Sequence, residues 1–171
     1  MRNAKDLHGL AIVDVKGGNK LGSADEIVIS PENGRLLGFV MKSMGVLSPN
    51  ERIVEMSDVR SIGPDAITVE GEEVAHTSEA AADEFRKARS GKRTLNGKKV
   101  VTQDGTVVGT ITDYLIDEGE ARVKGLVLGG GLFEKGDVIP ADRIVSVGSD
   151  VVVVSEPGAE AGASGPRPFV S

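Results

Sequence analysis

Short apolar segments separated by turn sequences run along nearly the whole chain. In the first half these segments are rich in valine and isoleucine and occupy Leu10–Val15, Lys20–Ile29, Leu36–Met41, Arg52–Met56, Val59–Ile62 and Ala66–Val69. Several of them alternate apolar with polar residues, which is typical of strands with one buried face. Turns such as Asn33-Gly34 separate them, and glycine there supplies the positive φ of a tight hairpin. The pattern predicts an antiparallel sheet, and a unit of about 65 residues removes its edges only by curling that sheet into a barrel.

The second half of the chain repeats the first. Four motifs recur in order: Leu7-x-Gly9 as Leu95-x-Gly97, Gly22-Ser23 as Gly109-Thr110, Arg35-Leu36-Leu37-Gly38 as Arg122-Val123-Lys124-Gly125, and Ser61-Ile62-Gly63 as Ser146-Val147-Gly148. The offset between the copies falls from 88 residues at the start to 85 at the end, as expected for one unit with small loop insertions. We therefore expect two small barrels with the same strand order, in which Gly22 matches Gly109 and Gly38 matches Gly125.

Between the two copies the pattern changes to that of a helix. Residues 79–89 carry acidic groups in their first half and basic groups in their second, which complements a helix dipole, and Gly91 follows them. Thr77 or Ser78 can cap such a helix at its start. Because a helix this short is marginal on its own, we expect Phe85 and the alanines to pack on a barrel.

These observations divide the chain into four parts. We expect a first barrel at residues 1–71, a helical linker at 72–94, a second barrel at 95–156 and a disordered tail at 157–171. The tail has no apolar pattern and is rich in glycine, alanine and proline. Its final Pro168-Phe169-Val170 is either a frayed terminus or a docking peptide.

Composition and charge narrow the class of protein. The chain has no cysteine, which excludes disulfides, thiolate metal sites and a thiol nucleophile. Its longest apolar stretch, from Gly125 to Phe133, is far shorter than the ~20 residues of a membrane span, and no signal-peptide pattern follows the start. The net charge of −6 argues against nucleic acid as the main partner. We expect a soluble protein of the bacterial cytoplasm, without a transmembrane segment.

Two longer strand patterns carry a family resemblance. The first copy reads Leu21-Gly22-x-x-x-Glu26-Ile27-Val28-Ile29 and then Gly34-Arg35-Leu36-x-Gly38-Phe39-Val40, and the second reads Val108-Gly109-x-x-x-Asp113-Tyr114-Leu115-Ile116 and then Val123-x-Gly125-Leu126-Val127. With them the chain resembles a tandem PRC-barrel protein. That family includes the cytoplasmic domain of the photosynthetic reaction-centre H subunit and the C-terminal domain of a ribosome maturation factor. The resemblance implies an all-β fold of two small antiparallel PRC-type barrels that dock onto larger assemblies, and it implies no shared catalytic residues.

The sequence offers little for catalysis. Its two histidines, His8 and His76, lie at a predicted strand start and in the linker. Neither belongs to a serine, histidine and acid arrangement at a recognisable spacing. We therefore predict that the chain is not an enzyme and has no catalytic residue.

Two further patterns bear on metal and phosphate binding. The acidic residues Asp113, Asp117, Glu118 and Glu120 do not follow the order of a calcium-binding EF-hand loop, which favours a solvated hairpin turn. Gly129-Gly130-Gly131 lies between two predicted strands, whereas a phosphate-binding loop needs a helix after it. We predict no metal site and no cofactor.

One stretch of the chain is strongly basic. It contains no acidic residue, and its basic residues are Arg86, Lys87, Arg89, Lys92, Arg93, Lys98 and Lys99. These are either solvated charges after a helix or contacts to an acidic protein, RNA or an anionic membrane surface. No aromatic residue accompanies them for base stacking, which weakens the RNA interpretation.

Two equivalent loops carry apolar side chains where polar ones are expected. Their residues are Met44, Val46, Leu47, Leu132 and Phe133. Exposed apolar clusters mark interfaces, and methionine suits adaptable contacts. The loops therefore either form an interface, within the chain or in a homodimer, or plug the ends of the barrels.

The function expected from these observations is a non-catalytic protein-interaction or assembly module, whose partner is another protein or a second copy of the chain. Two alternatives stay open. One is an accessory subunit that binds a small ligand or supports electron transfer, which predicts a polar cavity with perturbed acids. The other is a ribosome-assembly factor that acts through the basic stretch.

Overall fold

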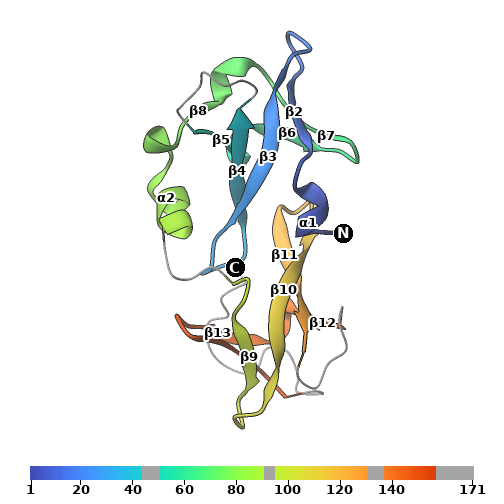
Figure 1. The fold of residues 1–171 in the computed structure, drawn as a ribbon, viewed down its shortest axis with the longest axis vertical. Helices are drawn as coiled ribbons and strands as arrows, with labels where there is room; N and C mark the ends of the chain where they lie inside the picture. The colour runs from blue at the N-terminus through green and yellow to red at the C-terminus, as the bar shows by residue number, and fades with distance from the viewer. Residues whose placement is uncertain (44–50, 91–94, 131–136, 157–171) are drawn as a thin grey trace. The chain divides into compact units, whose positions relative to one another are not determined.

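The computed structural model describes residues 1–43, 51–90, 95–130 and 137–156. Its strands form two seven-stranded sheets, and the chain divides into two compact units (Figure 1). The unit called here the first barrel comprises Ala4–Ile29 and Leu36–Ser90, and the second barrel comprises Met1–Asn3, Ser30–Arg35 and Gly91–Ser171. The all-β, two-barrel fold class expected from the sequence is confirmed.

The first barrel is one sheet with two short helices. Its strands lie in the order β6-β7-β2-β3-β4-β5-β8. The elements are α1 (Ala4–Leu7), β2 (Ala11–Asp14), β3 (Lys20–Ile29), β4 (Leu36–Ser43), β5 (Arg52–Glu55), β6 (Val59–Ile62), β7 (Ala66–Val69), β8 (His76–Thr77) and α2 (Asp83–Ser90), with 3₁₀ turns at Met56–Asp58, Glu72–Val74 and Ser78–Ala80.

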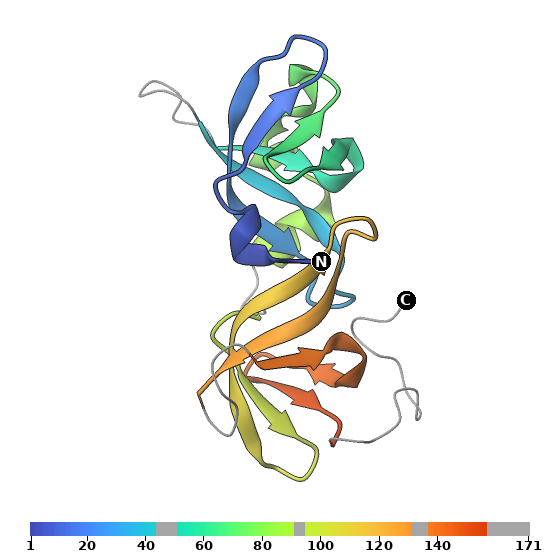
Figure 2. The same cartoon turned by 90° about the vertical axis from the view of Figure 1, so that its right-hand side faces the viewer.

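The second barrel is built in the same way. Its strands lie in the order β12-β11-β10-β9-β14-β13, and β1 (Arg2–Asn3) pairs with β10. The other elements are β9 (Lys99–Thr102), β10 (Val107–Asp117), β11 (Arg122–Gly129), β12 (Asp137–Pro140), β13 (Ile144–Val147) and β14 (Val151–Val154), with a 3₁₀ turn at Ala141–Arg143. The curl of this sheet, from yellow through orange to red, can be followed in Figure 2.

The two sheets share their strand order and their irregularities. Read as β6-β7-β2-β3-β4-β5 and β13-β14-β9-β10-β11-β12, the orders are identical. The register between β3 and β4 shifts between Ala24 and Glu26, and that between β10 and β11 shifts between Ile111 and Asp113, which are 87 residues further on. Because a β-bulge is a specific local distortion, matched bulges mean matched backbone paths. The predicted repeat of one unit is confirmed.

The glycines that aligned the two copies also match in the sheets. Gly38 lies opposite Glu55 on the neighbouring strand, and Gly125 lies opposite Pro140. The amide of Gly63 donates to the carbonyl of Ala66 at 2.9 Å, and Gly148 donates to the residue that matches Ala66 at the same distance. The sequence alignment therefore gives the correct structural register across the loop insertions.

Each barrel encloses an apolar core made mostly of aliphatic side chains. In the second barrel the core comprises Leu95, Val100, Val108, Ile111, Leu126, Leu128, Ile139, Ala141, Ile144, Val152 and Val154. The matching side chains of the first barrel include Leu7, Ile12, Phe39, Val54 and Ile67, all fully buried. Because side chains alternate between the two faces of a strand, the residues between these core positions point outward.

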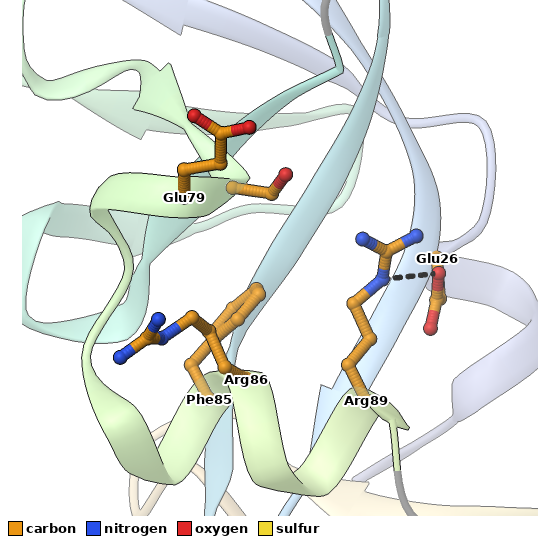
Figure 3. Close-up of a pocket in the computed structure, with 6 residues that line it drawn as sticks. Glu26, Glu79, Phe85, Arg86 and Arg89 are labelled. Atoms are coloured by element: carbon orange, nitrogen blue, oxygen red, sulfur yellow. Dashed lines mark hydrogen bonds and ion pairs between the residues drawn. The ribbon is translucent and has the colours of Figure 1, made fainter.

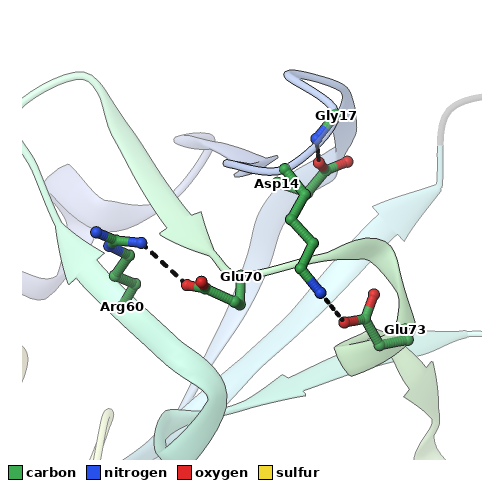
Figure 4. Close-up of polar contacts among 6 residues, drawn as sticks. Asp14, Gly17, Arg60, Glu70 and Glu73 are labelled. Carbon is green, nitrogen blue, oxygen red and sulfur yellow. Dashed lines mark hydrogen bonds and ion pairs between the residues drawn. The ribbon is translucent and has the colours of Figure 1, made fainter.

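A buried polar side chain organises the first hairpin of each barrel. In the first barrel Asp14 accepts a hydrogen bond from the amide of Gly17, next to the ion pairs Lys16–Glu73 and Arg60–Glu70 (Figure 4). At the matching position of the second barrel the hydroxyl of Thr102 accepts a hydrogen bond from the amide of Thr106 at 3.2 Å. An aspartate in one barrel and a threonine in the other thus accept a hydrogen bond from a backbone amide of the same turn. Comparison of the two sequences alone does not predict this equivalence.

The helix between the two copies is shorter than the predicted residues 79–89. It covers Asp83–Ser90, and a 3₁₀ turn at Ser78–Ala80 precedes it. Ala81 is extended, and the amide of Ala82 donates to the carboxylate of Glu55 at 2.7 Å. Glu55 therefore takes the capping role that Thr77 or Ser78 was expected to fill, and it comes from the end of β5.

No helix within the described residues combines the length and the apolar character that are needed to cross a membrane.

Candidate functional site

Helix α2 covers the outer face of strands β3, β4 and β5. This face, called here the covered face, presents Val28, Val40 and Ile53, all almost fully buried. They form a cluster with Phe85 and Ala81, and Ala88 packs against it. The first barrel therefore has apolar layers on both sides of this part of its sheet, and the outer layer depends on a segment that follows the last barrel strand.

Gly38 makes room for the aromatic ring of the helix. A Cβ atom built at this glycine would lie 2.2 Å from the carbonyl oxygen of Val54 and 3.0 Å from Cε2 of Phe85. Gly38 also has a φ of 151°, which side-chain-bearing residues rarely adopt. The close approach of Phe85 to the sheet thus requires glycine at this position.

Ion pairs fix the far end of the helix. Arg89 donates from Nε to Glu26 at 3.0 Å and from Nη1 to Glu51 at 2.8 Å. The hydrogen bond to Glu51 and that to Glu26 raise the pKa of Arg89 above its ordinary value, against the effect of partial burial. Arg89 is therefore occupied with holding α2 on the sheet.

A pocket of about 560 Å³ lies beside α2 within the first barrel. Its lining residues are Glu26, Ser78, Glu79, Phe85, Arg86 and Arg89 (Figure 3). Two of its charged groups are paired with each other, since Arg89 donates to Glu26 at 3.0 Å. The pocket is therefore lined by polar side chains and by the ring of Phe85, and the charges of Arg89 and Glu26 partly cancel. Its size admits a small molecule.

The matching face of the second barrel carries no such helix in the part of the chain that the structure describes. This open face presents Leu115, Val127 and Val138, which match Val28, Val40 and Ile53. Leu115 and Val127 are half-buried, and Val138 is 41% exposed, whereas Ile53 is 0% exposed. Within the described residues, two faces with the same strand order thus differ in whether an apolar segment covers them.

The neighbouring strand edge differs in the same way. In the first barrel β8 pairs with β5, through Arg52 with Thr77 and Ile53 with His76. In the second barrel β12 is the end of the strand order, and no described segment pairs with its outer side. An exposed edge next to an apolar face can accept an added strand or peptide.

Three described residues of the basic stretch are engaged in contacts within their own barrel. Arg86 pairs with Asp83 and Arg89 with Glu26 and Glu51, while Lys98 is nearly buried and donates from Nζ to the carbonyl of Gly148 at 2.7 Å. Lys87 and Lys99 are exposed on α2 and β9, in different barrels, and Lys92 and Arg93 lie outside the described residues. Their role in anion contact stays a prediction.

The five apolar loop residues expected at an interface also lie outside the described residues. They are Met44, Val46, Leu47, Leu132 and Phe133. The structure therefore leaves the choice between an interface and barrel plugs as a prediction.

The open face was missed by sequence reasoning because a pattern of alternation shows that a side chain points outward, but not what covers it.

Three acidic residues near the β10–β11 hairpin, Asp117, Glu118 and Glu120, make contacts that stabilise the hairpin and its surroundings. Asp117 accepts a hydrogen bond from the amide of Glu120 at 2.9 Å, which lowers the pKa of the Asp117 carboxyl. Glu118 pairs with Arg2, and Glu120 pairs with Lys124. Within the described residues no three acidic or histidine side chains are grouped so that they could hold a metal ion.

The two histidines lie beside carboxylates. His8 Nε2 is 3.7 Å from Asp25 at the surface, and His76 Nε2 is 3.7 Å from Glu55 next to the start of α2. The second contact belongs to the group that joins β5, β8 and the helix start. Neither histidine–carboxylate contact includes a serine or threonine hydroxyl that the histidine could activate.

Tyr114 gives a spectroscopic test of the second core. It packs against the core of the second barrel, and burial raises the pKa of its phenol well above the ordinary value of 10.0. The neutral phenol is thus favoured in the folded state. Stability from this group is complete below the unfolded pKa near 10 and declines as pH rises above it.

We expect Tyr114 to stay neutral in the folded protein at pH values where free tyrosine ionises. The chain has this one tyrosine and no tryptophan, so phenolate absorbance reports on it alone. Ionisation should coincide with alkaline unfolding, followed in parallel by far-UV circular dichroism. Phenolate formation near pH 10 while the sheet signal is intact would contradict the burial of Tyr114.

Comparison with known protein families adds an independent finding. The PRC-barrel domain matches the chain twice, over residues 1–75 and 90–161. No individual curated protein matches it. The two matched segments take in both repeats of the sheet, with their shared strand order and shared bulges. The sequence repeat, the repeated strand order and the two family matches therefore agree. The chain belongs to the PRC-barrel domain family.

Proposed function

We propose that this protein is a non-catalytic interaction or assembly module, and that the open face of the second barrel is its contact surface. The observation that carries the proposal is the difference between the two barrels. In the first, the matching face is covered by α2, whereas in the second Val138 is 41% exposed, Leu115 and Val127 are half-buried, and no described segment pairs with the outer edge of β12. Membership of a family of small barrels is consistent with a binding role.

The covered face indicates the chemistry of a suitable partner. There, a segment pairs briefly with the edge of β5 and then places an aromatic ring over Gly38. The open face has the corresponding edge, β12, and the corresponding glycine, Gly125. A protein segment that pairs with β12 and carries an aromatic or large aliphatic side chain therefore fits this surface.

The test is comparative affinity purification from the native host. Wild-type protein, Val138→Asp and Val107→Asp are used as baits, and captured proteins are quantified by mass spectrometry. Val107 is a matched control because it is 45% exposed on the same barrel but lies at the start of β10. We expect at least one protein to be lost with Val138→Asp and retained with Val107→Asp. If Val138→Asp retains every protein that the wild type captures, the open face is not the contact surface.

A second candidate function is small-ligand binding, and the pocket beside α2 favours it. Arg86 is one of the lining residues, and although it pairs with Asp83, its remaining N–H donors suit an anionic ligand. Thermal-shift screening with small carboxylates and phosphates tests this idea, with Arg86→Ala as the variant and Lys87→Ala as the control on the same helix. A ligand whose stabilising effect is lost only with Arg86→Ala would support it.

Other features of the proposal rest on sequence alone. The four-part division at residues 1–71, 72–94, 95–156 and 157–171, the bacterial cytoplasm as location, and a homodimer held by the apolar loops are all parts of this proposal. Analytical ultracentrifugation of wild type and of the double variant Leu132→Asp with Phe133→Asp tests the homodimer. If the wild type and the double variant have the same mass in solution, the apolar loops do not hold a homodimer.

A further inference from the structure

Residues 75–90 of the first barrel, called here the covering segment, contact their sheet in the way that bound peptides do. The segment begins at Ala75, whose carbonyl accepts a hydrogen bond from Arg52 at 3.0 Å, and continues as β8 along the edge of β5. It then lays α2 across the apolar side chains of the covered face. Strand addition at a sheet edge and a helix on an apolar face are both recurring modes of peptide recognition.

One aromatic side chain is the main anchor of the covering segment. Phe85 is 2% exposed within the cluster on the covered face. The strand β8 has two residues and α2 has eight, which is too short for a helix that is stable alone. The side chain of Arg89, which pairs with two glutamates, is 28% exposed, and ion pairs that solvent reaches contribute little to stability. The segment therefore depends largely on the burial of Phe85.

The covering segment is an addition to the part of the fold that the two barrels share. Strands β2 to β7 have the same order as β9 to β14. The second barrel has this order although no segment within the described residues covers its matching face. The covering segment therefore lies outside the six strands that define each barrel.

We propose that the covered face is a second protein-binding site, which the covering segment occupies and from which a similar segment of another protein displaces it. This inference goes beyond the proposed function, which concerns the open face of the second barrel. It makes the contact between α2 and its sheet an autoinhibitory one.

The contacts of the covering segment define the kind of partner that fits. An aromatic ring lies over Gly38, and an arginine four residues later reaches Glu26 and Glu51. A third acid, Glu55, accepts a hydrogen bond at the start of the helix. Three carboxylates around an apolar centre favour a basic segment over an acidic one. The partner therefore presents a short helix with an aromatic residue and, one turn later, an arginine.

A synthetic peptide with the sequence of residues 75–90 tests this site in the full-length chain. It is added to the wild type and to Phe85→Asp, in which the covering segment has lost its anchor. Lys87→Ala is the matched control, because Lys87 is exposed on the same helix. We expect the peptide to bind Phe85→Asp at least ten-fold more tightly than the other two chains, since a tethered segment competes at a high effective concentration.

Methyl NMR signals locate the bound peptide. Those of Val28 and Val40 on the covered face should shift, whereas shifts confined to Val127 and Val138 would place the peptide on the open face and overturn the inference. Absence of binding to Phe85→Asp, or equal binding to the wild type, would also overturn it. A wild-type dimer that Phe85→Asp dissociates would contradict it in favour of a second copy as the partner.

Hydrogen exchange of the wild-type chain covers the case in which Phe85→Asp does not fold. The hydrogen-bonded amides of α2 should have protection factors at least ten-fold lower than those of β3 and β4, because the covering segment leaves the sheet while the barrel stays folded. Equal protection factors would mean that α2 opens only when the whole barrel unfolds, and would overturn the inference.

Discussion

Replacement of Phe85 by alanine is expected to lower the free energy of unfolding of the first barrel by about 3–5 kcal/mol. Phe85 is 2% exposed and is the one aromatic residue in the cluster between α2 and the sheet. Its loss leaves a cavity over Gly38 and removes the main apolar anchor of a helix of eight residues, which is too short to be stable alone.

Native-state hydrogen exchange measures this effect in each barrel separately. In Phe85→Ala the amides of β3 and β4 should lose protection, and those of β10 and β11 should keep theirs. Lys87→Ala is the control, because Lys87 is exposed on the same helix. A loss of less than about 1 kcal/mol, typical of a surface substitution, would mean that α2 does not hold the covered face.

The second large effect is expected at Gly38. Gly38→Ala should destabilise the first barrel by about 3 kcal/mol, because it combines an unfavourable backbone conformation with a clash. The new Cβ would lie 2.2 Å from the carbonyl oxygen of Val54 and 2.9 Å from Cα of Glu55, and backbone atoms cannot rotate away.

The matching glycine of the second barrel is an internal control. At Gly125 the nearest atom to a new Cβ would be Cγ1 of Val138, at 2.7 Å, and this side chain is partly exposed and can change rotamer. Gly125→Ala should therefore cost only about 1 kcal/mol. Chemical denaturation of both variants gives the comparison, and equal losses would contradict the difference between the two faces.

The barrels themselves could be predicted from the sequence because their signals are local and occur twice. Alternating valine and isoleucine defined the strands, Asn33-Gly34 marked a hairpin, and the drifting offset placed the loop insertions. Gly34 has a positive φ, as that turn requires. Phe85 was expected to pack on a barrel because the helix was too short to stand alone, and it does.

The parts that sequence reasoning missed depend on partners distant in the chain. Helix α2 starts at Asp83 because the carboxylate that caps it comes from Glu55, far away in sequence. Arg89 was assigned to a basic stretch, but its two acceptors lie on other segments of the same barrel. The contrast between a covered and an open face likewise follows from tertiary packing, which alternation along a strand does not encode.

The most direct test of this account compares Ile53 with Val138, the matched side chains that are 0% and 41% exposed. A soluble paramagnetic agent attenuates the methyl NMR signals of side chains that solvent reaches. In the full-length protein, strong attenuation is predicted at Val138 and little at Ile53. Equal attenuation at the two positions would contradict the claim that this protein keeps one barrel face covered and presents the other for binding.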